Sequence, residues 1–257
     1  MTLFQKALVM IMYNSIVKIE IPLLITTNTF FHIGTGMGNQ YVNRTVMKDH
    51  EGFLYIPASS LKGKLRNICE ELAERFHLKN CSPHGTEQCH HRFTCIICRI
   101  FGSKYRQSKL LFDNAYMTEE SKNRFRDFQT YQTQSRSQIM INRHLRTAED
   151  GHLFQSEYGL PAISFQGGIK GILPATPLDG KDISHSYELV LLLAGLKLLK
   201  FIGGNKSTGC GSIDLKIGFK DKSGDNFIKI YEEKKDINSL LEQISELDNY
   251  NLQKAEN

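Results

Sequence analysis

The stretch IPASSLKGKLRNICEEL, residues 56–72, organises the rest of the chain. It predicts a strand end, a tight turn and the start of a helix. Either Ser59 or Ser60 is expected to cap this helix, because a serine hydroxyl accepts a hydrogen bond from a free N–H of the first turn. Residues at helical spacing form one apolar face, namely Leu61, Leu65, Ile68, Cys69 and Leu72.

Three basic residues of the same stretch, Lys62, Lys64 and Arg66, lie off the apolar face. The first turn of a helix leaves backbone N–H groups free and carries a partial positive charge, which attracts anions. The stretch therefore fits two interpretations. One is an amphipathic helix with solvated basic residues, and the other is a phosphate-binding helix start.

The composition is that of an ordinary globular protein of mildly basic character. The chain has 257 residues, a formal net charge of +5 and a pI near 8.8, which is compatible with nucleic-acid binding but does not establish it. No uninterrupted apolar run is long enough for a membrane helix. The N-terminus lacks a small-residue cleavage site, so we expect no secretion signal. Together with the clustered cysteines described next, this predicts a protein of the reducing cytoplasm, without membrane contact.

Four of the six cysteines lie close together, with the spacing Cys81-x7-Cys89-x5-Cys95-x2-Cys98. A CxxC pair places two thiolates on one turn, as tetrahedral zinc requires, and two further cysteines complete the set. His84, His90 and His91 are alternatives for any one of them. Four protein ligands leave no open position, so the sequence predicts a structural Zn²⁺ in an insertion at residues 77–103.

Alternating apolar residues predict several strands. Residues 15–26 form a half-buried strand in which Pro22 suggests a sheet edge or a bulge. Further strands are expected at residues 46–49, 53–56, 109–116 and 163–172. A strongly apolar helix should run from residue 182 or 184 to 201, and a last helix should lie within the tail 236–257. This order predicts an α+β, ferredoxin-like sheet with helices on one face.

Two glycine-rich loops and one long polar segment separate these elements. Gly34, Gly36 and Gly38 form the first loop, and Gly203–Gly211 form the second, where bare backbone can approach a ligand. Residues 121–156 are polar, with basic and aromatic side chains interleaved. That composition suits either a surface loop or a contact with single-stranded nucleic acid.

Four stretches in this order resemble one protein family: HIGTG at 32–36, IPASSLKGKLR at 56–66, INRHLRTAEDGHLFQSEYGLPAISF at 141–165 and LKLLKFIGGNKSTGCGSIDL at 196–215. CRIFGS at 98–103 and LLFDNAY at 110–116 fit between them. The chain resembles the RAMP superfamily, and within it the repeated backbone subunit of type III CRISPR–Cas effector complexes. The resemblance covers roughly residues 15–217.

The resemblance implies a single RAMP domain, residues 1–257, in an antiviral ribonucleoprotein. Its palm would be a modified RNA-recognition fold, with the zinc knuckle in a finger insertion and residues 121–156 as a thumb loop that kinks the guide–target duplex. Its implied partners are guide crRNA, complementary target RNA and other complex subunits, including copies of itself. The implied RNA-binding residues are His32, Gly34, Ser59, Ser60, Lys62, Lys64, Arg66, Arg143, Arg146, Gly203, Gly204, Lys206, Ser207 and Gly209.

One position departs from the family pattern. Active members cut target RNA with an aspartate shortly before a V-x-K/R-D run, which here is VMKD at 46–49, and the matching residue is Asn43. An amide cannot draw a proton from a 2′-hydroxyl or supply a negative charge. We therefore expect no catalytic residue and a subunit that binds without cutting, with Asp49 as the fallback candidate.

Three alternatives stay open at this stage. The chain could be an RNA-guided endoribonuclease that uses an acidic residue of the loop 32–51. It could be a terminal cap subunit of the same complex, which meets RNA at one end only. It could also be a stand-alone zinc-stabilised RNA-binding protein.

Overall fold

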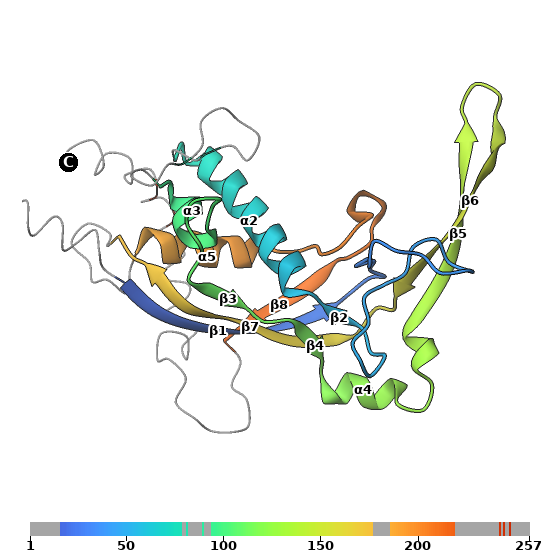
Figure 1. Ribbon diagram of the computed structural model, residues 1–257, viewed down its shortest axis with the longest axis horizontal. Helices are drawn as coiled ribbons and strands as arrows, with labels where there is room; N and C mark the ends of the chain where they lie inside the picture. The colour runs from blue at the N-terminus through green and yellow to red at the C-terminus, as the bar shows by residue number, and fades with distance from the viewer. Residues whose placement is uncertain are drawn as a thin grey trace, which may run out of the picture.

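The computed structural model describes residues 16–78, 81, 89, 94–176, 186–218, 242, 244 and 247. One curved sheet carries helices on one side, and a long two-stranded hairpin projects from one end (Figure 1). The expected C-terminal helix falls almost wholly outside the described residues, as do His84, His90 and His91. Among the described helices, none has both the length and the apolarity needed to cross a membrane.

The main sheet has six strands in the order β2-β4-β7-β1-β8, with β3 also paired to β7. Every described strand pair in it is antiparallel. The expected combination of helices with one sheet is confirmed. The strands are β1 (Ile16–Thr27), β2 (Tyr55–Ile56), β3 (Leu110–Phe112), β4 (Ala115–Met117), β7 (Ser164–Pro174) and β8 (Ile213–Ile217).

Strand β1 confirms the expected alternation, because Ile19, Ile21, Leu23 and Ile25 are all fully buried under the helices. The strand lies inside the sheet, between β7 and β8. Pro22 is tolerated there because the described pairing with β8 begins at Leu23, so the missing N–H falls where that pairing stops.

Three helices cover one face of the sheet: α2 (Ala58–Arg75), α3 (Ile96–Phe101) and α5 (Tyr187–Leu198) (Figure 1). Helix α5 packs against α2 and is buried from Tyr187 to Leu196, in accordance with its continuous apolar sequence. It begins later and ends earlier than predicted. Near its start, buried Glu188 pairs with Arg99 of α3 at 3.0 Å and accepts a hydrogen bond from the Thr176 N–H.

The start of α2 corrects the prediction of a serine cap. The helix begins at Ala58, Pro57 occupies the N-cap position, and neither Ser59 nor Ser60 caps it. Both serines lie within the first turn of the helix, after the N-cap position, and are exposed. The side chain of Asn114, before β4, supplies the missing acceptor, since its Oδ1 lies 2.8 Å from the Ala58 N–H.

The segment 121–156, predicted as an irregular loop, is mostly regular structure. Helix α4 (Glu119–Phe125) and a short 3-10 helix (Gln129–Gln132) lead into the hairpin of β5 (Thr133–Asn142) and β6 (Thr147–Gly159). Sequence periodicity missed the strands because the outer hairpin is exposed among the described residues, so no buried face imposes alternation there. Its apolar residues are each more than half exposed: Ile139, Met140, Ile141, Leu145 and Leu153.

The expected strands at 46–49 and 53–56 exist only in part. Gly34 bridges to Val46 and Lys48 bridges to Leu54, whereas regular strand structure is confined to β2. The turn at residues 49–53 is closed by Asp49, whose Oδ1 accepts hydrogen bonds of 2.9 Å from the N–H groups of Glu51 and Phe53.

Candidate nucleic-acid interface and metal centre

The second glycine loop packs directly on the segment that contains His32. The Gly204 N–H donates to the His32 carbonyl at 2.9 Å, and the Gly211 N–H donates to the Phe30 carbonyl at 2.7 Å. A Cβ atom at Gly203 would overlap the same His32 carbonyl, and Gly203 has a φ of +72°. Glycine is therefore required for this loop to lie so close to the segment that contains His32.

The start of α2 and the glycine loop meet at two lysines. The side chains of Lys64 on α2 and Lys206 in the loop lie beside each other, and the pKa of Lys64 is lowered, first by burial and then by the charge of Lys206. Two ammonium groups held together repel each other until an anion lies between them. The fold thus joins two distant basic stretches into one place suited to a phosphate.

A polar network connects this place to the base of the hairpin. His32 Nδ1 lies 2.7 Å from the Glu157 carbonyl, and the His32 ring lies 5.6 Å from that of Tyr158. The Tyr158 hydroxyl accepts a hydrogen bond of 2.6 Å from Asn205. Arg136 stacks on Phe30, with its guanidinium carbon 4.1 Å from the ring centroid. His32 is thus part of a framework that fixes β6 against the glycine loop.

The structure brings only part of the predicted RNA-binding set together. His32, Gly34, Lys64 and the residues Gly203, Gly204, Lys206, Ser207 and Gly209 lie in one region. Arg143 and Arg146 lie in the turn that connects β5 to β6, at the far end of the projecting hairpin (Figure 1).

Lys62 and Arg66 lie on the side of α2 that faces residues 101–108, whereas Lys64 lies beside Lys206. Arg66 donates from Nε to Glu70 at 2.8 Å and from a terminal nitrogen to the Gly102 carbonyl at 3.1 Å. Burial would lower the pKa of Arg66, but the Glu70 contact outweighs it and raises that pKa. The predicted single basic site on α2 is thus divided between two sides of the helix.

Asn43 and Asp49, the two candidate positions in the loop 32–51, both make structural contacts. Asn43 Oδ1 accepts from the Gln155 N–H at 2.8 Å, and the Asn43 N–H donates to the Gln155 carbonyl at 3.0 Å. These bonds hold the loop against β6. Asp49 closes its own turn through two backbone N–H groups, so that carboxylate already has a structural role.

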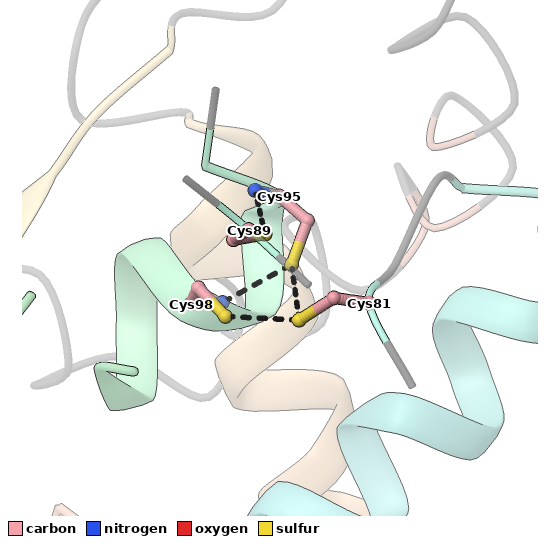
Figure 2. A group of neighbouring side chains, drawn as sticks. All are labelled: Cys81, Cys89, Cys95 and Cys98. Atoms are coloured by element: carbon pink, nitrogen blue, oxygen red, sulfur yellow. Dashed lines mark hydrogen bonds between the residues drawn. The ribbon is translucent and has the colours of Figure 1, made fainter. Parts of the chain in front are cut away.

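The four clustered cysteines converge beside α3, as Figure 2 shows. Their sulfur atoms all lie within 4.8 Å of one another, and the Cys81–Cys98 and Cys81–Cys95 pairs are 3.2 and 3.7 Å apart. Tetrahedral thiolate ligands about 2.3 Å from a zinc ion would stand about 3.8 Å apart. The set therefore has the size and the ligand number of a tetrahedral metal centre.

Hydrogen bonds to the sulfur atoms also favour a metal centre. The Cys95 N–H donates to Cys89 Sγ at 3.2 Å, and the Cys98 N–H donates to Cys95 Sγ at 3.4 Å. Hydrogen bonds from the Cys98 thiol and N–H lower the pKa of Cys95. Backbone N–H groups directed at sulfur atoms would stabilise thiolate ligands around a cation.

A family model for the RAMP superfamily matches residues 24–214, a span that includes both glycine loops, α2, the cysteines and the hairpin. The chain belongs to the RAMP superfamily. The structure described above, with its mixed α/β composition and antiparallel sheet, is a RAMP fold.

One individual relative and two solved structures are similar to this RAMP chain. It is similar to the CRISPR system Cms endoribonuclease Csm3 of Methanocaldococcus jannaschii, with 26% identity over 250 residues that cover 90% of this chain and 93% of that protein. Among solved structures, a chain of type III-B Cmr-beta bound to cognate target RNA has a TM-score of 0.54 at 14% identity. The match covers 80% of this RAMP chain and 98% of the other.

The apo state of type III-B Cmr-beta gives a similar result, with a TM-score of 0.53 at 14% identity. The match covers 77% of this RAMP chain and 96% of the other. At this level of identity the two solved structures show a common fold. The shared fold spans nearly the whole of each solved chain.

Sequence reasoning missed three residues that fix β6 against the two loops, namely Glu157, Tyr158 and Asn205. Glu157 accepts from the Val46 N–H at 3.1 Å and from Lys48 at 2.7 Å. Asn205 adopts a left-handed backbone conformation with a φ of +57°, which Asn tolerates better than most residues. The two glycines before Asn205 were a sequence signal for a tight turn at that residue. The local sequence around Glu157 and Tyr158 contains no comparable signal.

Proposed function

We propose that this RAMP protein is a guide-RNA-binding backbone subunit of a type III CRISPR–Cas interference complex. Its RNA site would lie where the start of α2 meets the glycine loop, with Lys64 and Lys206 on a shared phosphate. Lysines give affinity for the strand without reading bases, so sequence would be read by pairing between guide and target.

The observation that carries this proposal is the position of Lys64 beside Lys206. Around them, exposed Ser59, Ser60 and Ser207 offer hydroxyl groups, and Gly209 has open space where a Cβ would stand. Similarity to Csm3 and to chains of type III-B Cmr-beta supports the assignment to such a complex. The strand order β4-β7-β1-β8 supports the finer description of the palm as ferredoxin-like.

The hairpin β5–β6 is the proposed thumb. It projects from the sheet with exposed apolar residues near its end and Arg143 and Arg146 in its turn (Figure 1). Apolar side chains can separate stacked bases, and arginines can hold the adjacent phosphates. The thumb would thus kink the guide–target duplex, and the subunit would stack with copies of itself or with related RAMP subunits along the guide.

The metal proposed for Cys81, Cys89, Cys95 and Cys98 is a structural Zn²⁺. Four sulfur ligands leave no position for water or substrate, so the ion would only hold the segment around α3 in place. The reduced cysteines suit a cytoplasmic complex, which is also where guide RNA and its target would meet.

We further propose that this subunit does not cut the target itself. Asn43 occupies the position of the expected aspartate and makes two hydrogen bonds with the backbone of Gln155. The second candidate function is an RNA-guided endoribonuclease, which the description of the Methanocaldococcus jannaschii relative as an endoribonuclease favours. A terminal cap subunit or a stand-alone RNA-binding protein would bind RNA through the same surface.

The deciding experiment is purification of the tagged chain from its own cells, followed by extraction and sizing of bound RNA. We expect guide RNA of discrete length, partner subunits and several copies of this chain per complex. One copy would indicate a cap, and RNA-free protein without partners would overturn the proposal. Cutting of a guide-paired target that Asp49→Ala abolishes would establish the endoribonuclease instead.

A further inference from the structure

An open pocket of about 630 Å³ lies between α2, the cysteine cluster and the loop at residues 102–108. It lies on the Lys62 and Arg66 side of α2, apart from Lys64 and the glycine loop. Nothing in the proposed function uses it. The wall opposite α2 is a tight turn, in which the Ser103 N–H donates to the Arg106 carbonyl at 2.7 Å.

The described lining of this pocket is strongly basic. Lys62 and Arg66 enter from α2, and Lys104 and Arg106 enter from the turn, whereas the described lining contains no carboxylate. Glu70 pairs with Arg66 from outside the lining. None of the salt bridges among the described residues neutralises Lys62, Lys104 or Arg106.

Lys62 lacks a compensating negative charge among the described residues, although it is partly buried. Its Nζ lies over the Phe112 ring at 5.7 Å, and its pKa is lowered, first by burial and then by the charge of Arg66. The ring of Tyr105, which is 40% exposed, lies at the rim, with Lys104 5.8 Å from its centroid. Cations beside an exposed aromatic ring suit a nucleotide, since the ring can stack on a base while the cations hold its phosphate.

The metal centre beside the pocket offers a competing explanation for the basic residues. Four thiolates around a divalent cation carry a net charge of about −2, which nearby basic residues would stabilise. Four cations line the pocket, however, and together they exceed the combined charge of Glu70 and such a centre. Lys104 and Arg106 lie in the turn beyond α3 and are exposed, which suits an external anion better than a buried thiolate.

We propose that this pocket is a second phosphate site, distinct from the Lys64–Lys206 site, that binds a nucleotide phosphate through Lys62, Lys104 and Arg106. The phosphate would belong to the same RNA strand that contacts the Lys64–Lys206 site. The inference therefore rests on the proposed function. A free mononucleotide has the same chemistry and is the alternative source. The pocket would then add a second, sequence-independent hold on the strand.

The test compares double variants of the full-length, metal-loaded protein. Binding of a labelled single-stranded RNA is measured by fluorescence anisotropy over a range of salt concentrations. Lys104→Ala/Arg106→Ala removes two of the four pocket cations. Lys18→Ala/Lys216→Ala removes the same charge from the helix-free face of the sheet and serves as the matched control. Lys64→Ala/Lys206→Ala tests the first site separately, and metal content is measured for every variant.

We expect the pocket variant to bind RNA about tenfold more weakly than wild type, while the control stays within about twofold. The slope of log K against log salt should fall by about 0.7 for each phosphate that the variant no longer holds. If AMP binds to wild type and not to the pocket variant in calorimetry, and RNA affinity is unchanged, the phosphate site stands and its source is a free nucleotide.

Two outcomes would overturn the inference. One is unchanged RNA affinity, salt slope and AMP binding in the pocket variant. The other is loss of metal from that variant with unchanged RNA and AMP binding, which would mean that the cations only balance the thiolates. Weaker RNA binding by Lys64→Ala/Lys206→Ala alone, with AMP binding unchanged in the pocket variant, would leave the proposed function intact while the pocket fails. Wild-type protein that binds AMP but no RNA would support the pocket and refute the proposed function.

Discussion

Asn43 Oδ1 accepts a hydrogen bond of 2.8 Å from the backbone N–H of Gln155, so the loop before β2 is held against the base of the hairpin. The contact needs an oxygen at the δ position and does not need the amide nitrogen. An aspartate in the same place can therefore keep the structure while adding a negative charge. Active members of the family have an aspartate where this chain has Asn43. The fold should therefore tolerate an aspartate at this position.

The first prediction concerns that restoration. Asn43→Asp should keep wild-type stability and should give the assembled complex metal-dependent cleavage of guide-paired target RNA, which the wild-type subunit lacks. Asn43→Ala should be inactive, as the wild type is. Its loss of the hydrogen bond should cost about 1 kcal/mol of unfolding free energy. Gel analysis of end-labelled target RNA reads cleavage, and thermal unfolding reads stability. Cleavage by the wild-type subunit would contradict the assignment.

The second prediction concerns the lysine pair. Lys64→Ala and Lys206→Ala should each weaken RNA binding about tenfold and lower the salt slope, because each removes a charged phosphate contact. In the RNA-free protein, each change should slightly raise stability or leave it unaltered, since it relieves repulsion. Anisotropy and denaturant unfolding measure the two effects. Stable variants that bind RNA as wild type does would exclude this site.

The third prediction concerns Glu157, which connects β6 to Val46 and Lys48. Burial acts to raise its pKa, but hydrogen bonds from Lys48 and the Val46 N–H outweigh burial and hold the pKa below the ordinary 4.5. Its contribution to stability is therefore complete above about pH 4.5 and is lost as the pH falls through the lower, folded-state pKa.

Glu157→Gln should accordingly cost about 1–3 kcal/mol of unfolding free energy at pH 7, and the cost should shrink on acidification below about pH 4.5. Urea unfolding at a series of pH values measures this dependence. Glu51→Gln is a suitable control, because Glu51 is exposed and solvent screens its ion pair with Lys122. An equal cost for Glu157→Gln at every pH would contradict this role for the carboxylate.

The fourth prediction concerns the metal. Purified protein should contain about one equivalent of zinc, and chelation should release it and lower the unfolding temperature. Cys95→Ser should lose the ion in the same way. Cys210→Ser changes a buried cysteine outside the cluster and should keep its zinc. Elemental analysis together with thermal unfolding checks both results, and less than about half an equivalent of zinc in wild type would count against four-cysteine ligation.

The fifth prediction concerns the hairpin. Replacing residues 140–152 with an Asn-Gly turn should leave the body folded, because Ile139 and Leu153 already face each other and the removed part is exposed. Guide RNA should still co-purify, whereas chemical probing of bound target RNA should no longer show regularly spaced unstacked bases. Regular spacing in the shortened protein would mean that another element kinks the duplex.

The sequence by itself determined the parts of this protein that depend on local patterns. Alternation placed β1 and β7, helical spacing placed the buried face of α2, and four closely spaced cysteines indicated the metal centre. Each of these features is visible locally, because burial on one face or ligation by neighbouring residues imposes a short period or spacing. Motif order was also sufficient to indicate the RAMP superfamily.

Tertiary structure alone decided how these parts combine. The cap of α2 comes from Asn114 and not from Ser59 or Ser60, and the exposed hairpin has no buried face that periodicity could reveal. The basic residues of α2 separate into Lys64, which meets Lys206, and Lys62 with Arg66, which face the cysteine cluster. Which side chains share a site depends on contacts between residues far apart in the chain, and local sequence patterns do not contain that information.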